Sequence, residues 1–141
     1  MRRVTSRDVW LLLTAEVLLA ITRLALSVFS FQVVLQVLNR LSVVSRDGHL
    51  PTADAIERVK WAVGRASRCV PGARHCLTQA LAAQFLLARQ GRSTQLRIGV
   101  AKDEAGQLRA HAWLESDGVA IFGVPHSGLQ EYRLLPHLDR A

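Results

Sequence analysis

Two neighbouring segments decide the fold of this chain: ARHCLTQALAAQFLLARQG at residues 73–91 and LRIGV at residues 96–100. The first segment is rich in alanine, leucine and glutamine, which are strong helix formers, and it ends at Gly91, a residue type favoured just after a helix. In the second segment apolar side chains occupy every other position, the spacing of a strand with one buried face. The sequence therefore predicts a helix followed directly by a β-strand.

Two further strands are predicted after this one. Residues 107–115 and residues 119–124 are separated by Asp117-Gly118, the residue pair typical of a two-residue hairpin turn. A turn containing Gly106 precedes the first of them. We therefore expect an α+β fold in which a helix is followed by a three-stranded antiparallel sheet.

The N-terminal third is strongly apolar, and we interpret it as two helices, Ser6–Ala20 and Ile21–Leu41. A polar break at residues 45–52 contains the turn formers Gly48 and Pro51. We predict a third helix from about Ala53 to Ala66 after this break.

This organisation divides the chain into an apolar helical region, residues 1–45, and a second unit, residues 52–141. The longest uncharged run, Leu24–Asn39, has sixteen residues, whereas a helix that spans a bilayer needs about 20. A helix apolar on most faces is buried, docked on a partner or in contact with a membrane. We expect a cytoplasmic protein whose N-terminal helices face the core or a partner. Membrane association stays open but is not favoured.

Composition narrows the class of protein. The 141 residues carry a net charge of +7, are 50% hydrophobic and include two cysteines, which excludes a disulfide scaffold and a four-cysteine zinc site. Arginine supplies most of the positive charge, which suits carboxylate or phosphate recognition and is equally the mark of a GC-rich genome. Aromatic residues make up only 6%, and no basic run is interleaved with them, so nucleic acid is not an expected partner.

Cys76 is the first candidate functional residue, because it falls at or within one turn of the start of the predicted helix. Unpaired N–H groups and the helix dipole stabilise a thiolate there, and the same N–H groups can hold an oxyanion. Two structural alternatives remain open. Cys76 can be a small buried hydrophobic residue, or it can form a disulfide with Cys69.

His111 is the second candidate and lies on the second predicted strand, on the same face as Trp113 and Glu115. If this sheet packs on the helix of Cys76, the imidazole and the thiol could meet, as in cysteine peptidases and transglutaminases. A lone histidine on a strand is more often structural. A metal hydrolase is disfavoured because no two of the five histidines have the i, i+4 spacing of metalloprotease ligands. We expect neither a metal nor another cofactor.

The segments HCLTQALA (75–82), LRIGV (96–100) and AHAWLE (110–115) together resemble the leader peptidases of lasso-peptide biosynthesis, the family of the microcin-processing protease. The resemblance covers about residues 53–135. It implies a transglutaminase-like, papain-like fold and a cysteine peptidase that removes the leader from a ribosomal precursor peptide. The family's catalytic cysteine falls on Cys76 and its histidine on His111.

The single-domain length resembles the split form of this family, which implies several partners. These are the leader region of the precursor peptide, a separate leader-recognition protein and, as a further candidate, the ATP-dependent lasso cyclase that closes the macrolactam ring. The apolar N-terminal helices could supply the surface that docks on the leader-recognition protein.

The chain departs from the family at the residue that orients the histidine, commonly an aspartate on the next strand. A two-residue turn pairs Ser116 with Val119 and puts His111 opposite Val124, beside Gly123, and residues 119–124 contain no carboxylate. Glu115 lies about 13 Å along the strand, too far for a hydrogen bond. The remaining possibilities are a Cys–His dyad, or a backbone carbonyl or water that fixes the imidazole. A non-catalytic binding module with the same fold is the alternative function.

Overall fold

The computed structural model describes residues 3–41, 53–70, 75–125 and 128–135. Helices come first along the chain and strands follow, which confirms the predicted α+β fold. The helices of this part of the chain are α1 (Ser6–Val28), α2 (Phe31–Leu41), α3 (Ala53–Cys69) and α4 (Cys76–Arg89). The strands are β1 (Gln95–Lys102), β2 (Leu108–Ser116), β3 (Val119–Phe122) and β4 (Arg133–Leu134).

The sheet is antiparallel, with the strand order β3-β2-β1-β4. Strands β1 and β2 form a long regular hairpin whose register runs from Gln95 opposite Glu115 to Lys102 opposite Leu108. The prediction of three strands was incomplete, because the two-residue β4 pairs with β1, with Leu134 opposite Gly99. A strand this short shows no periodicity in the sequence, and only its pairing partner defines it.

The predicted boundary between the first two helices was wrong. Helix α1 continues past residue 20 to Val28, and the break falls at Phe29, whose backbone is extended (φ −108°, ψ 157°). Ala20 and Ile21 are not helix breakers, whereas the carbonyl of Ser30 accepts hydrogen bonds from the N–H groups of the first turn of α2.

The predicted start of α1 at Ser6 is confirmed, and a capping box fixes it. The side chain of Thr5 accepts from the backbone N–H of Asp8, and the Asp8 carboxylate accepts from the N–H of Thr5 at 2.9 Å. Helix α3 starts at Ala53 as predicted and runs to Cys69, about one turn further than predicted.

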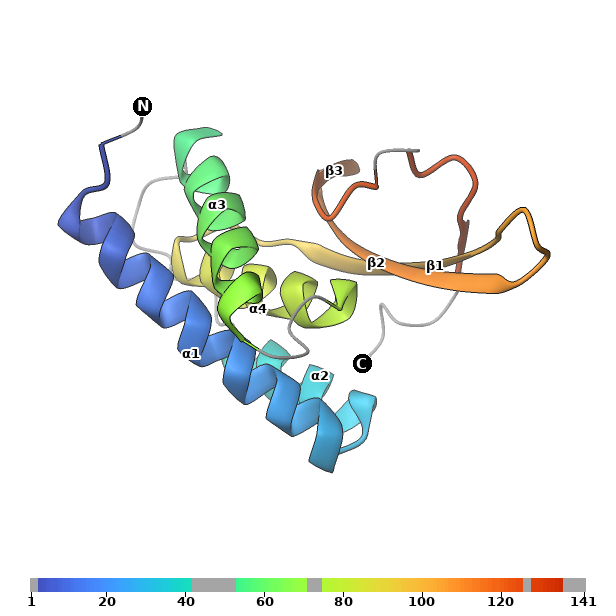
Figure 1. Cartoon of the computed structure of the whole chain (residues 1–141), viewed down its shortest axis with the longest axis horizontal. Coiled ribbons are helices and arrows are strands. Elements are labelled where there is room, and N and C mark those ends of the chain that lie inside the picture. Colours follow the sequence, from blue (N-terminus) through green and yellow to red (C-terminus); the bar gives the residue numbers. More distant parts are fainter. Residues whose placement is uncertain (1–2, 42–52, 71–74, 126–127, 136–141) are drawn as a thin grey trace.

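One hydrophobic core joins the helices to one face of the sheet. Helix α1 crosses α3 and α4, and α4 packs against β2, so all four helices lie on one side of the β1–β2 hairpin (Figure 1). The core residues come from every helix and three strands; they include Leu19, Leu35, Val63, Leu81, Leu87, Leu96, Leu114 and Phe122. The N-terminal helices therefore share a core with α3 and α4. The predicted division at residues 45–52 lies outside the described residues and stays a prediction.

Helix α1 is also long and apolar enough to cross a membrane. Its 18-residue window has a mean hydropathy of 1.9, and 22% of that window is buried inside the protein. The core helix of a soluble protein meets the same criteria of length and composition. In this chain one stripe of α1, with Leu11, Ala15 and Leu19, is buried in the core.

Candidate active site

Cys76 is the first residue of α4, as predicted, and its thiol is free and half-buried. Cys69 is also a free cysteine, so the disulfide that the sequence left open is not formed. Residue His75 occupies the N-cap position with extended backbone (ψ 131°), and its side chain makes no capping hydrogen bond. The first-turn N–H groups of α4 are therefore not occupied by a cap side chain, and they can stabilise a negative charge on the thiol or on a bound carbonyl oxygen.

The half-buried His111 side chain is held by a main-chain carbonyl. Its ring nitrogen Nε2 donates a hydrogen bond to the carbonyl oxygen of Gly123, because a carbonyl can only accept. In the neutral imidazole this leaves the lone pair on Nδ1, which is then the basic nitrogen. A backbone carbonyl was one of the acceptors that the sequence left open, and the structure supplies it.

A bulge brings the Gly123 carbonyl to this place. The turn pairs Ser116 with Val119 as predicted, but Leu114 then lies opposite Phe122 instead of residue 121, so the pairing shifts between Leu114 and Glu115. The predicted position of His111 opposite Val124 assumed an unbroken register and does not hold beyond the bulge. The φ of Gly123 is +80°, a conformation that disfavours any other residue.

The aromatic surroundings of His111 come from three elements. The ring centroids of His111 and Trp113 are 6.4 Å apart and stacked, and Tyr132, which precedes β4, lies 5.5 Å from the imidazole. Gly99 of β1 sits opposite His111, and a Cβ there would approach the Trp113 ring to 2.9 Å. Sequence reasoning missed Gly99 and Tyr132. The one signal in the sequence was the glycine at position 99 in the middle of a predicted strand, which indicates that another group packs closely against the backbone there.

Glu115 does not orient the imidazole, in agreement with the prediction that it is too far away. Its carboxylate accepts a hydrogen bond from Nε1 of Trp113 at 3.0 Å and pairs with Nε of Arg97 at 3.1 Å. These contacts fix the indole ring of Trp113, which is buried beside His111.

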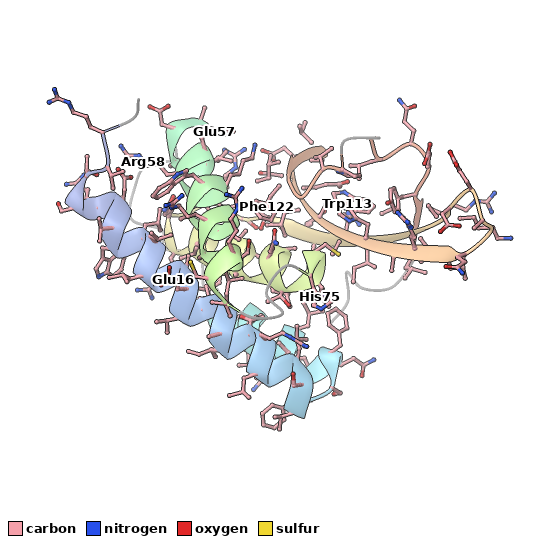
Figure 2. The ribbon with its side chains drawn as sticks, in the orientation of Figure 1. Glu16, Glu57, Arg58, His75, Trp113 and Phe122 are labelled. Carbon is pink, nitrogen blue, oxygen red and sulfur yellow. The ribbon has the colours of Figure 1, made fainter. Side chains whose placement is uncertain are left out.

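The structure brings the two elements that carry Cys76 and His111 together, since α4 packs against β2. It does not join the two side chains: no hydrogen bond between the Cys76 thiol and His111 is among those of the described residues. Cys76 packs on the core, to which β2 contributes Ala112 and Leu114. His111 alternates with those residues and therefore shares the other face of β2 with Trp113, which points away from the helices in Figure 2.

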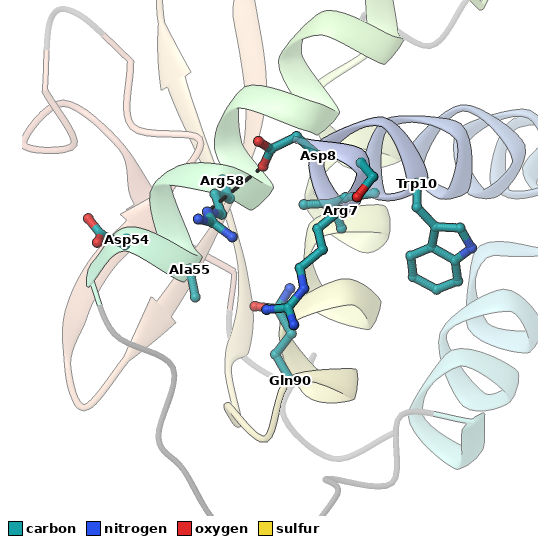
Figure 3. A pocket seen from close by; sticks show the side chains of 9 residues that line it. Arg7, Asp8, Trp10, Asp54, Ala55, Arg58 and Gln90 are labelled. Atoms are coloured by element: carbon teal, nitrogen blue, oxygen red, sulfur yellow. Dashed lines mark ion pairs between the residues drawn. The ribbon is translucent and has the colours of Figure 1, made fainter. Parts of the chain in front are cut away.

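A separate pocket of about 580 Å³ lies at the opposite end of α4, where Gln90 follows the helix (Figure 3). Its charged lining comes from the first turn of α1 and the first two turns of α3. The buried Asp8 carboxylate lies 3.8 Å from Nε of Arg58. Because α4 has 14 residues, its ends are about 20 Å apart, so this pocket is distinct from the surroundings of Cys76.

The described part of the chain offers no metal site. Among residues 3–41, 53–70, 75–125 and 128–135, no group of three or more His, Cys, Asp or Glu side chains could hold a metal ion. His49, His126 and His137 lie outside these ranges.

The helix with a cysteine at its start, followed by an antiparallel sheet with a histidine on its second strand, has the architecture of a transglutaminase-like domain. The model of the transglutaminase-like superfamily matches residues 18–136, most of the chain, so the protein belongs to this superfamily. It is a superfamily of cysteine hydrolases that includes lasso-peptide-processing proteases. The match begins within α1, so it takes in part of the N-terminal helices. No curated protein and no solved structure matches the chain significantly.

Proposed function

We propose that the protein is a cysteine peptidase that removes the leader from a ribosomally made lasso-peptide precursor. The observation that carries the proposal is the combination of a free thiol at a helix start with no N-cap side-chain bond and an imidazole on a strand packed against that helix. The imidazole is held through Nε2, which leaves the lone pair on Nδ1. Membership of the superfamily supports a thiol-based hydrolysis. The likeness of residues 75–82 and 110–115 to the leader peptidases supplies the substrate.

The reaction follows from these groups. Nδ1 of His111 takes the proton of the Cys76 thiol, and the thiolate attacks the carbonyl carbon of the bond between leader and core peptide. First-turn N–H groups of α4 hold the oxyanion of the tetrahedral intermediate. When this intermediate collapses, the C–N bond breaks, His111 delivers the proton to the leaving amine, and a thioester to Cys76 remains. Water, deprotonated by His111, then hydrolyses the thioester and restores the thiol.

The proposal needs the imidazole and the thiol to approach each other when the substrate binds, because none of the hydrogen bonds of the described residues joins them in the free protein. Catalytic hydrogen bonds of free enzymes are often long or poorly aligned and tighten only around the substrate. The required change is local, since α4 and β2 are already in contact.

We propose as partners the leader region of the precursor, a separate leader-recognition protein and the lasso cyclase, acting in the cytoplasm. The leader-recognition protein is proposed because a dedicated protein recognises the leader in the split systems that this chain resembles. The cyclase is proposed because cleavage frees the amine of the core peptide, and this amine is the nucleophile that a macrolactam synthetase consumes.

A non-catalytic peptide-binding module is the second candidate function. Two features favour it: none of the hydrogen bonds of the described residues joins Cys76 to His111, and the hydrogen-bond partner of His111 is a main-chain carbonyl instead of a carboxylate. The two functions differ in the reactivity of the thiol. Fast, pH-dependent alkylation of Cys76 supports the peptidase, whereas a slow, inert thiol supports the binding module.

The direct test is incubation of the full chain with candidate precursor peptides, with and without a candidate leader-recognition protein. Mass spectrometry should show two fragments that add up to the precursor plus one water. Turnover should rise when the leader-recognition protein is present. Intact precursor under all conditions, with the protein folded and its thiols reduced, would contradict the proposal.

Gly123→Ala tests the role of the carbonyl that holds His111. A Cβ at this position would lie 3.0 Å from the carbonyl oxygen of Ala112, and the φ of +80° strains any L-residue. We expect the free energy of unfolding to fall by about 1–3 kcal/mol and leader cleavage to fall by at least about tenfold at a temperature where the variant is folded.

Gly106→Ala is the matched control, because Gly106 has a similar φ of +77° and a Cβ there would meet no other atom within 4 Å. It should lose comparable stability in a urea titration and keep its cleavage rate. Equal losses of activity in both variants would show that backbone strain alone, and not the position of His111, causes the effect.

A further inference from the structure

The outer side of α1 exposes a continuous apolar stripe. We call it the outer apolar face; it consists of Trp10, Leu13, Val17, Ile21, Leu24 and Val28, each between 55% and 69% exposed. These residues recur every three or four positions, so they lie on one side of the helix, opposite the stripe buried in the core. A contiguous exposed patch of this kind marks an interaction site and not a random surface.

Helix α2 extends this surface. Phe29 between the two helices and Val33 and Val37 of α2 are also exposed, by 44–58%. A groove of about 450 Å³ runs between the helices, with Leu18, Ile21 and Val34 among the apolar side chains of its lining, and Thr22 is the one polar residue among the described residues that line it. Such a groove has the volume and polarity to take a hydrocarbon chain and offers almost nothing to a polar ligand.

The charges around the outer apolar face indicate what covers it. Arg3 and Arg7 are exposed at its N-terminal end, and Arg40 is exposed in the last turn of α2. Of the two acidic residues of α1, Asp8 is buried and Glu16 is half-buried. The chain as a whole carries a net charge of +7, so two copies repel each other, whereas an anionic surface attracts this side of the molecule.

We propose that the outer apolar face binds the surface of an anionic lipid bilayer, with α1 lying in the plane of the membrane. An apolar helix face flanked by arginines is the usual signature of such interfacial binding. A spanning orientation does not fit, because it would pull Leu11, Ala15 and Leu19 out of the core and expose the Asp8 carboxylate to hydrocarbon. The body of the protein then sits on the membrane with α3, α4 and the sheet on the aqueous side (Figure 1).

The test uses the full chain and vesicles of phosphatidylcholine with or without phosphatidylglycerol. We expect co-sedimentation with the anionic vesicles, weaker binding to the neutral ones, and partial loss of binding at high salt. The double variant Val17→Gln, Leu24→Gln should bind the anionic vesicles at least about tenfold more weakly. The reason is that it lacks two of the apolar side chains whose transfer from water into the bilayer stabilises the bound state. Leu108→Gln is the matched control: Leu108 is 71% exposed on β2, remote from α1, and its replacement should leave binding unchanged.

Trp10 reports the contact directly, because it is 69% exposed and belongs to the face. Its fluorescence should shift to the blue on addition of anionic vesicles, and Trp10→Phe should abolish the shift while the buried Trp113 is unaffected. The proposal is overturned if the protein does not co-sediment with the anionic vesicles and the fluorescence of Trp10 does not shift. It is also overturned if the double variant binds the vesicles as tightly as Leu108→Gln does. It is equally overturned if Trp10 is already shielded without lipid, through self-association or the leader-recognition protein.

Discussion

We expect Cys76→Ala to abolish cleavage of the leader and to leave the fold intact. We expect the rate to fall by about 10³-fold or more, because the thiol is the only group of this residue that can form the acyl intermediate. Stability should change little, since the thiol is half-buried at the first position of α4 and alanine is the best helix former. The measurement is a time course of precursor cleavage by mass spectrometry, with circular dichroism to confirm the fold.

Cys69→Ala is the matched control for this experiment. Cys69 is exposed at the end of α3, and among the described residues its Sγ makes only a long contact of 3.9 Å to the carbonyl of Arg65. This variant should cleave the precursor at the rate of the unmodified protein. Retained cleavage by Cys76→Ala, or equal loss in both variants, would end the assignment of Cys76 as the nucleophile.

His111→Gln should also abolish cleavage, by about 10²–10⁴-fold, while keeping the fold. The glutamine amide can donate to the Gly123 carbonyl as Nε2 of His111 does, but it has no basic nitrogen to take the proton of Cys76. If His111→Gln keeps its fold but loses activity, His111 acts as a base. If it keeps both, His111 only supports the sheet.

The rate of Cys76 alkylation gives a second readout for His111→Gln. If the imidazole draws the thiol proton, the variant should react with iodoacetamide more slowly than the unmodified protein, and the pH dependence of the reaction should lose one step. An unchanged alkylation profile together with full cleavage activity would place His111 among the structural residues of β2. That outcome would favour the binding module.

The division of the N-terminal helices shows how far local sequence reasoning reached. The start of α1 was predictable because a polar cap precedes an apolar run. Its end was not, because the whole stretch is apolar and a helix break there depends on the carbonyl of Ser30 and the turn between α1 and α2. The sequence favoured the core or a protein partner for this region, and one stripe of α1 does lie in the core. The exposure of the outer apolar face depends on which side of α1 meets α3 and α4, and it is the basis of the proposed lipid contact.

The surroundings of His111 show the same division. Alternation along β2 and the turn at Asp117-Gly118 predicted that His111 lies near Gly123, but in a register that the bulge shifts by one residue. The bulge that turns the Gly123 carbonyl toward the imidazole, and the approach of Tyr132 from beyond β3, left no local signal. A bulge depends on how two strands pair, and Tyr132 reaches His111 only because β4 adds to the edge of β1.

By itself, the sequence determined the features that depend on local interactions. These are the cysteine at the start of α4, the alternating strands and the hairpin turn. Each of these depends on residues within about one or two turns of chain, through propensity, capping and periodicity. The tertiary structure alone decided which carbonyl holds His111, that no hydrogen bond of the described residues joins the Cys76 thiol to the imidazole, and which face of α1 meets water. Those outcomes depend on contacts between residues far apart in the chain, where shape and burial override local preference.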